Sequence, residues 1–202
     1  MLFALLYREE FFETRMKLPK LLLLASMMSP ILATPSYAAP HPAGVTLDET
    51  QEITLNNGAE VTSIDPAKQA AEPAFNLGRD LFEGLVIQDK QGKTIPGVAE
   101  SWSVNDNNTV YTFHLRDAKW SNGETVTAQD FVYSWQRLLN PSTASPYAWF
   151  AAIPNIENSQ AIMKGESDPE SLGVKALDEK TFQVTLEAPI PFFTKLLSHP
   201  VL

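Results

Sequence analysis

Alternating hydrophobic and polar positions predict β-strands along much of the chain. Residues 110–115 place Tyr, Phe and Leu at every second position, the period of two expected of a strand with one buried face. The same alternation over 181–186 follows a polar turn at 178–180, which predicts a hairpin that a proline closes. A second hairpin is predicted within 86–95, around the turn 89–92. The pattern therefore predicts two hairpins and a further strand with one buried face.

A helical period predicts a helix from Thr127 onward. Thr127 and Asp130 have the spacing of a capping box, with Asp in place of the usual Glu. Phe131, Trp135 and Leu138 then fall on one side, and the proline at 141 ends the helix. Two shorter helices are predicted, one within 155–165 that ends at a glycine and one that begins within 190–200.

The region before residue 86 carries weaker patterns. Residues 51–58 mix β-branched and polar side chains before an Asn-Asn-Gly turn, which predicts a strand whose pairing partners are absent from the chain. Pro66 and Pro73 bracket a loop or a short helical turn. Leu77, Leu81 and Leu85 then recur every four residues and predict one stripe of an amphipathic helix.

Two tryptophans flank the predicted Asn-Gly turn at 122–123. Trp120 follows a strand and Trp135 lies on the apolar face of the next helix. Since tryptophan fills a core or its edge more often than it contacts a ligand, both are interpreted as structural.

Composition narrows the class of protein. The chain has 202 residues, 44% of them hydrophobic and 19% charged, enough for a packed core and for one to one and a half domains. It contains no cysteine, which excludes disulfides, thiolate metal sites and a cysteine nucleophile. The net charge of -9 opposes binding to nucleic acid or to an anionic membrane surface.

The N-terminus predicts export. Lys17 and Lys20 precede an apolar run, and a small-x-small cleavage pattern ends at Ala38. Residues 1–38 are interpreted as a signal peptide, with Met16 as the expected true start because the preceding stretch is too acidic for a leader. A membrane anchor is the alternative, but the run before Pro30 is shorter than the roughly 20 residues that a bilayer requires.

No pattern in the sequence points to catalysis. His41, His114 and His199 lack metal-ligand spacing, and there is no nucleophile elbow, phosphate-binding loop or dinucleotide fingerprint. The many carboxylates are scattered, as solvation of an acidic protein requires. We therefore expect a binding protein that is not an enzyme and needs no cofactor. A secreted hydrolase with a hidden acid/base pair and a stand-alone interaction module remain as alternatives.

Several stretches, in a consistent order, resemble one known family. They are "RDLFEGLV" at 79–86, "PGVAESW" at 96–102, "YTFHLRDAKWSNGETVTAQDFVYSWQRLLNP" at 111–141, "SPYAWF" at 145–150 and "LGVKALDEKTFQVTL" at 172–186. The chain is similar over about 44–200 to the periplasmic oligopeptide-binding proteins of ABC importers, solute-binding protein family 5, and to the relative that binds murein tripeptide.

The resemblance implies an α/β fold of the periplasmic-binding-protein type II, three-lobed class, with this chain as a truncated N-terminal portion. Residues 39–82 would open the ligand-binding lobe I, and 83–202 would form nearly all of the small lobe II. The implied protein is a periplasmic monomer that captures oligopeptides or murein tripeptide and delivers them to an inner-membrane ABC permease. As a portion, the chain is expected not to bind peptide alone.

The resemblance also implies peptide-binding residues. Ala70, Ala71 and Glu72 match the family segment whose backbone pairs with the ligand as an added strand, and main-chain hydrogen bonds are common to every peptide. Tyr147 matches a tyrosine near the ligand backbone, whose hydroxyl can donate or accept a hydrogen bond. The alternatives are an ordinary surface loop and a tyrosine that only packs after a Ser-Pro turn.

Overall fold

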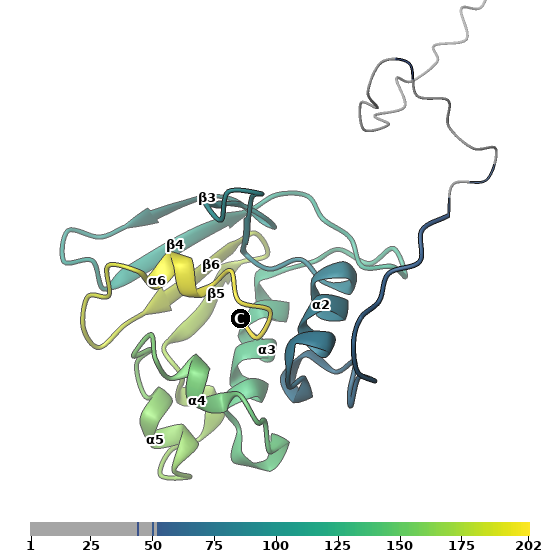
Figure 1. Ribbon diagram of the computed structural model, residues 1–202. Helices are drawn as coiled ribbons and strands as arrows, with labels where there is room; N and C mark the ends of the chain where they lie inside the picture. The colour runs from purple at the N-terminus through teal and green to yellow at the C-terminus, as the bar shows by residue number, and fades with distance from the viewer. Residues whose placement is uncertain (1–43, 45–49, 51) are drawn as a thin grey trace, which may run out of the picture. The chain divides into compact units, whose positions relative to one another are not determined.

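The computed structural model describes residues 44, 50 and 52–202 (Figure 1). The chain divides into a unit that ends at Ile53 and a second unit, Thr54–Leu202, which holds every helix and strand described below. The predicted signal peptide, its expected start at Met16 and residues 39–43 of the predicted lobe I segment lie outside the described residues.

The second unit combines two antiparallel sheets with short helices. Its elements in chain order are η1 (Pro66–Lys68), α2 (Glu72–Leu81), β1 (Val86–Gln88), β2 (Thr94–Pro96), β3 (Ala99–Val104), β4 (Val110–Leu115), α3 (Ala128–Leu139), η2 (Pro141–Thr143), α4 (Ala148–Ala151), α5 (Ser159–Met163), η3 (Pro169–Ser171), β5 (Val174–Asp178), β6 (Thr181–Thr185) and α6 (Phe193–Leu196). β1 pairs with β2, and the larger sheet has the order β3-β4-β6-β5.

The core lies on one face of the larger sheet. The alternate residues Tyr111, Phe113 and Leu115 of β4 are buried, as their period predicted. Trp135 of α3 packs edge-on against Phe182 of β6, with 5.2 Å between ring centroids. In Figure 1, α3 runs beside the sheet and α6 lies close to β4 and β6. Helices and strands thus share one apolar interior.

The capping box and the hairpin turns form as predicted. The Thr127 backbone N–H donates to Asp130 Oδ2 at 2.7 Å, and the Thr127 hydroxyl donates to the same oxygen at 3.0 Å. Gly92 has a positive φ of 74°, and its N–H donates to the carbonyl of Asp89 at 2.9 Å to close the β1–β2 turn. Gly123 likewise adopts a positive φ, of 89°, in the predicted Asn-Gly turn.

Two elements predicted before residue 86 are wrong. Residues 52–58 form no strand, because no strand of the described part pairs with them. The stripe Leu77, Leu81 and Leu85 is not the buried face of a helix: α2 ends at Leu81, whose side chain is 55% exposed. Its buried side chains are instead those of Ala74 and Phe75, next to Gly78.

The two tryptophans have different environments. Trp135 is 1% exposed and belongs to the core. Trp120 is 41% exposed and lines an open groove, so it does not belong to the core. The sequence pattern placed Trp135 on a helix face directed at a sheet, whereas Trp120 lies in a loop whose orientation depends on the tertiary fold.

An ion pair attaches the first part of the unit to α3. Arg137 donates two hydrogen bonds to Asp65, from Nη1 to Oδ1 at 2.7 Å and from Nη2 to Oδ2 at 2.5 Å. The paired guanidinium holds the pKa of the Asp65 carboxyl below its usual value, against the opposing effect of burial. The described residues include no helix long and apolar enough to cross a membrane.

Candidate functional site

A wide groove opens between segments that are far apart in the sequence. Its volume is about 1690 Å³, larger than the 300–1,000 Å³ typical of sites for small molecules. The walls come from the second half of α2, the β1 strand, the loop that carries Trp120, the exposed side of α3 and the residues after α6. An opening of this size and shape is better suited to a polymer or to another protein surface than to an enclosed metabolite.

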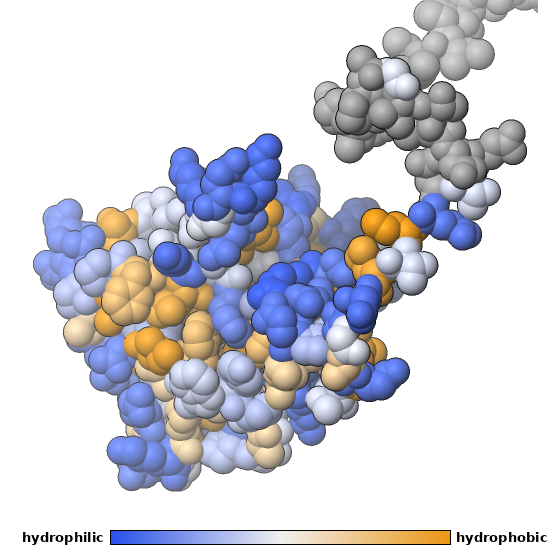
Figure 2. All heavy atoms as spheres, viewed as in Figure 1, coloured by the Kyte–Doolittle hydropathy of each residue, from blue (hydrophilic) through white to orange (hydrophobic). Residues whose placement is uncertain are grey.

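The groove is lined by apolar side chains that stay exposed. Leu81 is 55%, Phe82 42% and Phe192 51% exposed. Figure 2 shows hydrophobic side chains gathered over the region of α6, with polar groups around them. Charged residues of both signs accompany them, among them Glu83 and Arg116, which form an ion pair. Contiguous apolar surface of this kind marks an interaction site in a folded protein.

The predicted ligand loop lies directly before α2. Ala71 precedes the helix with φ 66° and ψ 160°. Residues other than glycine seldom adopt this backbone conformation, which costs on the order of 1–3 kcal/mol. Neither Gln69 nor Ala70 forms a backbone hydrogen bond with any other described residue. Gln69 is buried, so only the partly exposed main chain of Ala70 presents a donor and an acceptor that are unpaired among the described residues, at the start of the predicted ligand segment.

Glu72 opens the helix rather than extending the loop. Its side chain is exposed and forms an ion pair with Arg79 at 3.0 Å, seven residues further along α2. A carboxylate in the first turn is favourable because it faces the positive end of the helix dipole. Of the three loop residues, Ala70 and Ala71 thus offer only main chain, and Glu72 also offers a charge that Arg79 partly neutralises.

Tyr147 packs against the helix that follows the loop. Its ring meets the ring of Phe75 edge-on, with 5.0 Å between centroids, and lies 5.6 Å from the ring of Trp149. Phe75 is one turn after Glu72 on α2, so the structure brings the loop and Tyr147 to neighbouring parts of one surface. The packing interpretation of Tyr147 and its predicted ligand role are compatible, since only its hydroxyl would be needed at the cleft.

His199 is a member of this group that the sequence did not indicate. Its ring centroid lies 5.0 Å from that of Phe75, 5.9 Å from that of Tyr147 and 4.3 Å from that of Phe150. Burial lowers the pKa of His199, the nearby Arg79 cation lowers it further, and Glu72 acts in the opposite direction. A lone histidine without metal-ligand spacing carries no sequence signal, so only the tertiary fold reveals it.

The described residues hold no group of three or more His, Asp or Glu side chains that could bind a metal ion. The surface instead offers the main chain of Ala70, which pairs with no other described residue, together with exposed aromatic rings and a wide apolar groove. Those are the means by which proteins bind extended chains.

Comparison with known proteins places the chain in a class of binding proteins. Residues 93–202 match the model of a family described as bacterial extracellular solute-binding proteins, family 5 Middle. Because the match spans more than half of the chain, the chain belongs to the bacterial extracellular solute-binding proteins. Within that class it belongs to family 5, which confirms the family and the α/β fold class that the sequence predicted.

Two relatives from Escherichia coli cover most of this chain. The periplasmic oligopeptide-binding protein OppA is 53% identical over 178 residues, 88% of this chain and 32% of OppA. The periplasmic murein peptide-binding protein MppA is 51% identical over 165 residues, 81% of this chain and 30% of MppA. The chain therefore spans about a third of the length of the curated relatives it matches.

A solved structure agrees with the fold. Haemophilus influenzae OppA in complex with RPPGFSPFR superposes with a TM-score of 0.74 at 47% sequence identity, over 77% of this chain and 31% of that chain. At this identity the likeness extends from the fold to the family.

Proposed function

We propose that this chain supplies one wall of the peptide cleft of a periplasmic solute-binding protein that delivers oligopeptides to an inner-membrane ABC permease. The observation that carries the proposal is the partly exposed main chain of Ala70, which bonds to no other described residue, in a chain similar to a protein solved with RPPGFSPFR. A peptide that adds itself as a strand bonds through its own main chain, so binding would depend little on its side chains.

The individual roles follow from what each residue offers. Ala70 and Ala71 would donate and accept main-chain hydrogen bonds, and the strained backbone of Ala71 would turn the chain from the ligand into α2. Glu72 would add a carboxylate beside the ligand backbone. Tyr147, held by its contact with Phe75, would present its hydroxyl at the edge of the cleft.

We assign residues 39–82 to the opening segment of lobe I and 83–202 to the small lobe II. The exposed apolar groove supports this assignment, because about two thirds of the length of the relatives lies outside the matched part and could cover the groove. The Asp65–Arg137 ion pair would then join the two lobes. On this assignment the chain alone does not bind peptide, since most of the cleft would come from polypeptide outside it.

We further propose that residues 1–38 are removed on export and that the protein acts as a monomer in the periplasm. The relatives named for the periplasm support the location. The intact mass of the protein recovered from a periplasmic extract tests this part of the proposal. A mass that corresponds to 39–202 or to a longer chain starting at residue 39 is expected, whereas a mass that retains residues 1–38 would contradict it.

Calorimetry with a chimera tests the cleft. Residues 39–202 replace the corresponding part of Escherichia coli OppA, and tri- and tetrapeptides are titrated into the chimera and into the chain alone. We expect saturable binding by the chimera only.

Ala70→Pro, which removes one N–H, should weaken binding by the chimera by about 1 kcal/mol, whereas the control Ala70→Ser, which keeps that N–H, should bind normally. Equal binding by the two variants would refute the main-chain role.

A further inference from the structure

The residues after α6 end in a compact turn around His199. The N–H of His199 donates to the carbonyl of Leu196 at 3.1 Å, and the N–H of Leu202 donates to the carbonyl of His199 at 2.9 Å. The indole N–H of Trp135 donates to the carbonyl of Leu202 at 3.2 Å and so ties this segment to the buried side of α3. We call residues 198–202 the C-terminal segment.

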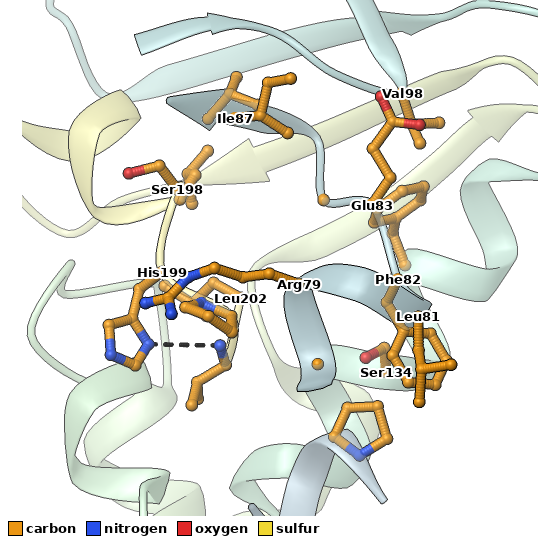
Figure 3. A pocket seen from close by; sticks show the side chains of 18 of the residues that line it. Arg79, Leu81, Phe82, Glu83, Ile87, Val98, Ser134, Ser198, His199 and Leu202 are labelled. Atoms are coloured by element: carbon orange, nitrogen blue, oxygen red, sulfur yellow. Dashed lines mark hydrogen bonds between the residues drawn. The ribbon is translucent and has the colours of Figure 1, made fainter. Parts of the chain in front are cut away.

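The imidazole also closes the turn within the segment. The N–H of Val201 donates to Nδ1 of His199 at 3.3 Å, the contact drawn as a dashed line in Figure 3. Because Nδ1 accepts this bond, the ring is neutral and carries its hydrogen on Nε2. An added proton would occupy Nδ1, and the Val201 N–H would then face a second donor.

The surroundings of the ring disfavour a positive charge. The imidazole is half-buried among the rings of Phe75, Tyr147 and Phe150. From α2 it faces one cation, Arg79, and one carboxylate, Glu72, which are paired with each other. Figure 3 shows the Arg79 side chain extending from α2 toward His199. Burial and Arg79 together outweigh Glu72, so the pKa of His199 lies below its usual value.

We propose that His199 is an acid-sensitive latch: protonation of its ring opens the turn within the C-terminal segment, which breaks the Leu202 bond to Trp135 of α3, and loosens the surface that carries Tyr147. This inference rests on the proposed function only in giving Tyr147 a ligand role, and the latch itself requires no ligand. The ring keeps its aromatic neighbours and its Val201 bond while neutral. Once charged, it loses the bond and must draw solvent into the cluster.

The direction of the pH effect follows from the lowered pKa. The unfolded chain takes up the proton near pH 6.5, before the folded chain does, so acid favours the open and unfolded forms. The contribution of the neutral ring to stability is complete above about pH 6.5 and is lost as the pH falls through the lowered pKa.

Hydrogen exchange in the full 202-residue chain tests the latch. The exchange protection of the Val201 amide and of the Trp135 indole N–H is measured by NMR between about pH 7.5 and about pH 5, after correction for the intrinsic pH dependence of exchange. In the wild type we expect both protections to fall along the same curve as the chemical shifts of the His199 ring titrate. Protection that stays constant while the ring titrates would overturn the proposal.

Two variants separate the effect of protonating His199 from the effect of its side chain as such. His199→Asn keeps an acceptor near the position of Nδ1 but cannot titrate, so the pH dependence of both protections should disappear. His114→Asn, on the exposed side of β4, should leave it unchanged. A His199→Asn chain that still opens in acid would assign the effect to another group. If this variant fails to fold, the wild-type titration alone decides. No peptide is present, so the outcome does not depend on whether the cleft binds one.

Discussion

Arg137 of α3 forms two parallel hydrogen bonds with Asp65, its partner 72 residues earlier in the chain. Both side chains are about one third exposed, at 32% and 30%. The pair fixes η1 and the loop before α2 against the main helix of the unit. The position of the candidate ligand loop therefore depends on a contact that is remote in sequence.

Replacing Arg137 by Lys should lower the free energy of unfolding by about 1 kcal/mol, because lysine cannot donate both parallel bonds and the site is partly screened by solvent. Urea unfolding measures the difference. Arg79→Lys is the matched control, since its pair with Glu72 is more exposed and should change stability by less than about 0.5 kcal/mol. Equal effects of the two substitutions would contradict the assigned role of Arg137.

The same pair predicts a pH dependence. The pKa of Asp65 is lowered in the folded state from its usual value of 3.8. The carboxylate therefore stabilises the folded state fully at pH values above 3.8. This contribution disappears as the pH falls through the lowered pKa. Asp65→Asn should therefore be less stable than the wild type near neutral pH and approach it in acid. A stability difference that is independent of pH would show that the charge of Asp65 is unimportant.

Removing the carboxylate of Asp130 should destabilise the unit by about 1 kcal/mol, because the N–H and the hydroxyl of Thr127 both lose their acceptor at the start of α3. Thermal unfolding of Asp130→Ala measures the loss. Glu124→Ala removes a carboxylate from a nearby exposed turn and should have little effect. A similar loss in both variants would mean that net charge matters here and the cap does not.

The two tryptophans should differ sharply in mutational cost. Trp135→Ala removes a fully buried ring and the bond to Leu202, so we expect a loss of about 3–5 kcal/mol in the free energy of unfolding. Trp120→Ala should cost less than about 1 kcal/mol, because that ring is already partly in solvent. Comparable losses of unfolding free energy for the two variants, measured by urea unfolding, would show that Trp120 packs in the core.

Gly78 should not tolerate alanine although it lies in a helix. A Cβ there would come within 2.5 Å of Oε1 of Gln69, whose buried amide finds no partner among the described residues. Gly78→Ala should therefore destabilise by about 1–3 kcal/mol despite the better helix propensity of alanine. The double variant with Gln69→Ala should recover part of that loss. A stabilising single variant would show that the Gln69 side chain can move aside.

The sequence predicted well those elements whose pattern is set by local geometry. The alternation in β4 and β6, the capping box of α3 and the two glycine turns depend on neighbours a few residues away. The family was also predictable, because its characteristic stretches occur in order. The predicted helix stripe of Leu77, Leu81 and Leu85 was wrong because α2 ends at Leu81. Leu85 lies between α2 and β1, where the helical period no longer applies.

The candidate site was only partly predictable. Ala70, Ala71, Glu72 and Tyr147 came from the resemblance, and their ligand role stays a prediction. The cluster of Phe75, Phe150 and His199 has no sequence signature, because its members come from three distant segments. The positive φ of Ala71 could not be predicted from the sequence either, because a positive φ is usually indicated by a glycine and not by an alanine.

The strand order β3-β4-β6-β5 has a consequence for the speed of folding. The β3–β4 and β5–β6 hairpins can each form from neighbouring residues, but the two central strands pair across 71 positions, as between Thr112 and Gln183. The long sequence separation of these contacts raises the contact order. Closing a loop of that length costs entropy before the central contacts form, which slows the rate-limiting step of folding. The two hairpins should therefore be early folding units, and their union the late event that completes the core.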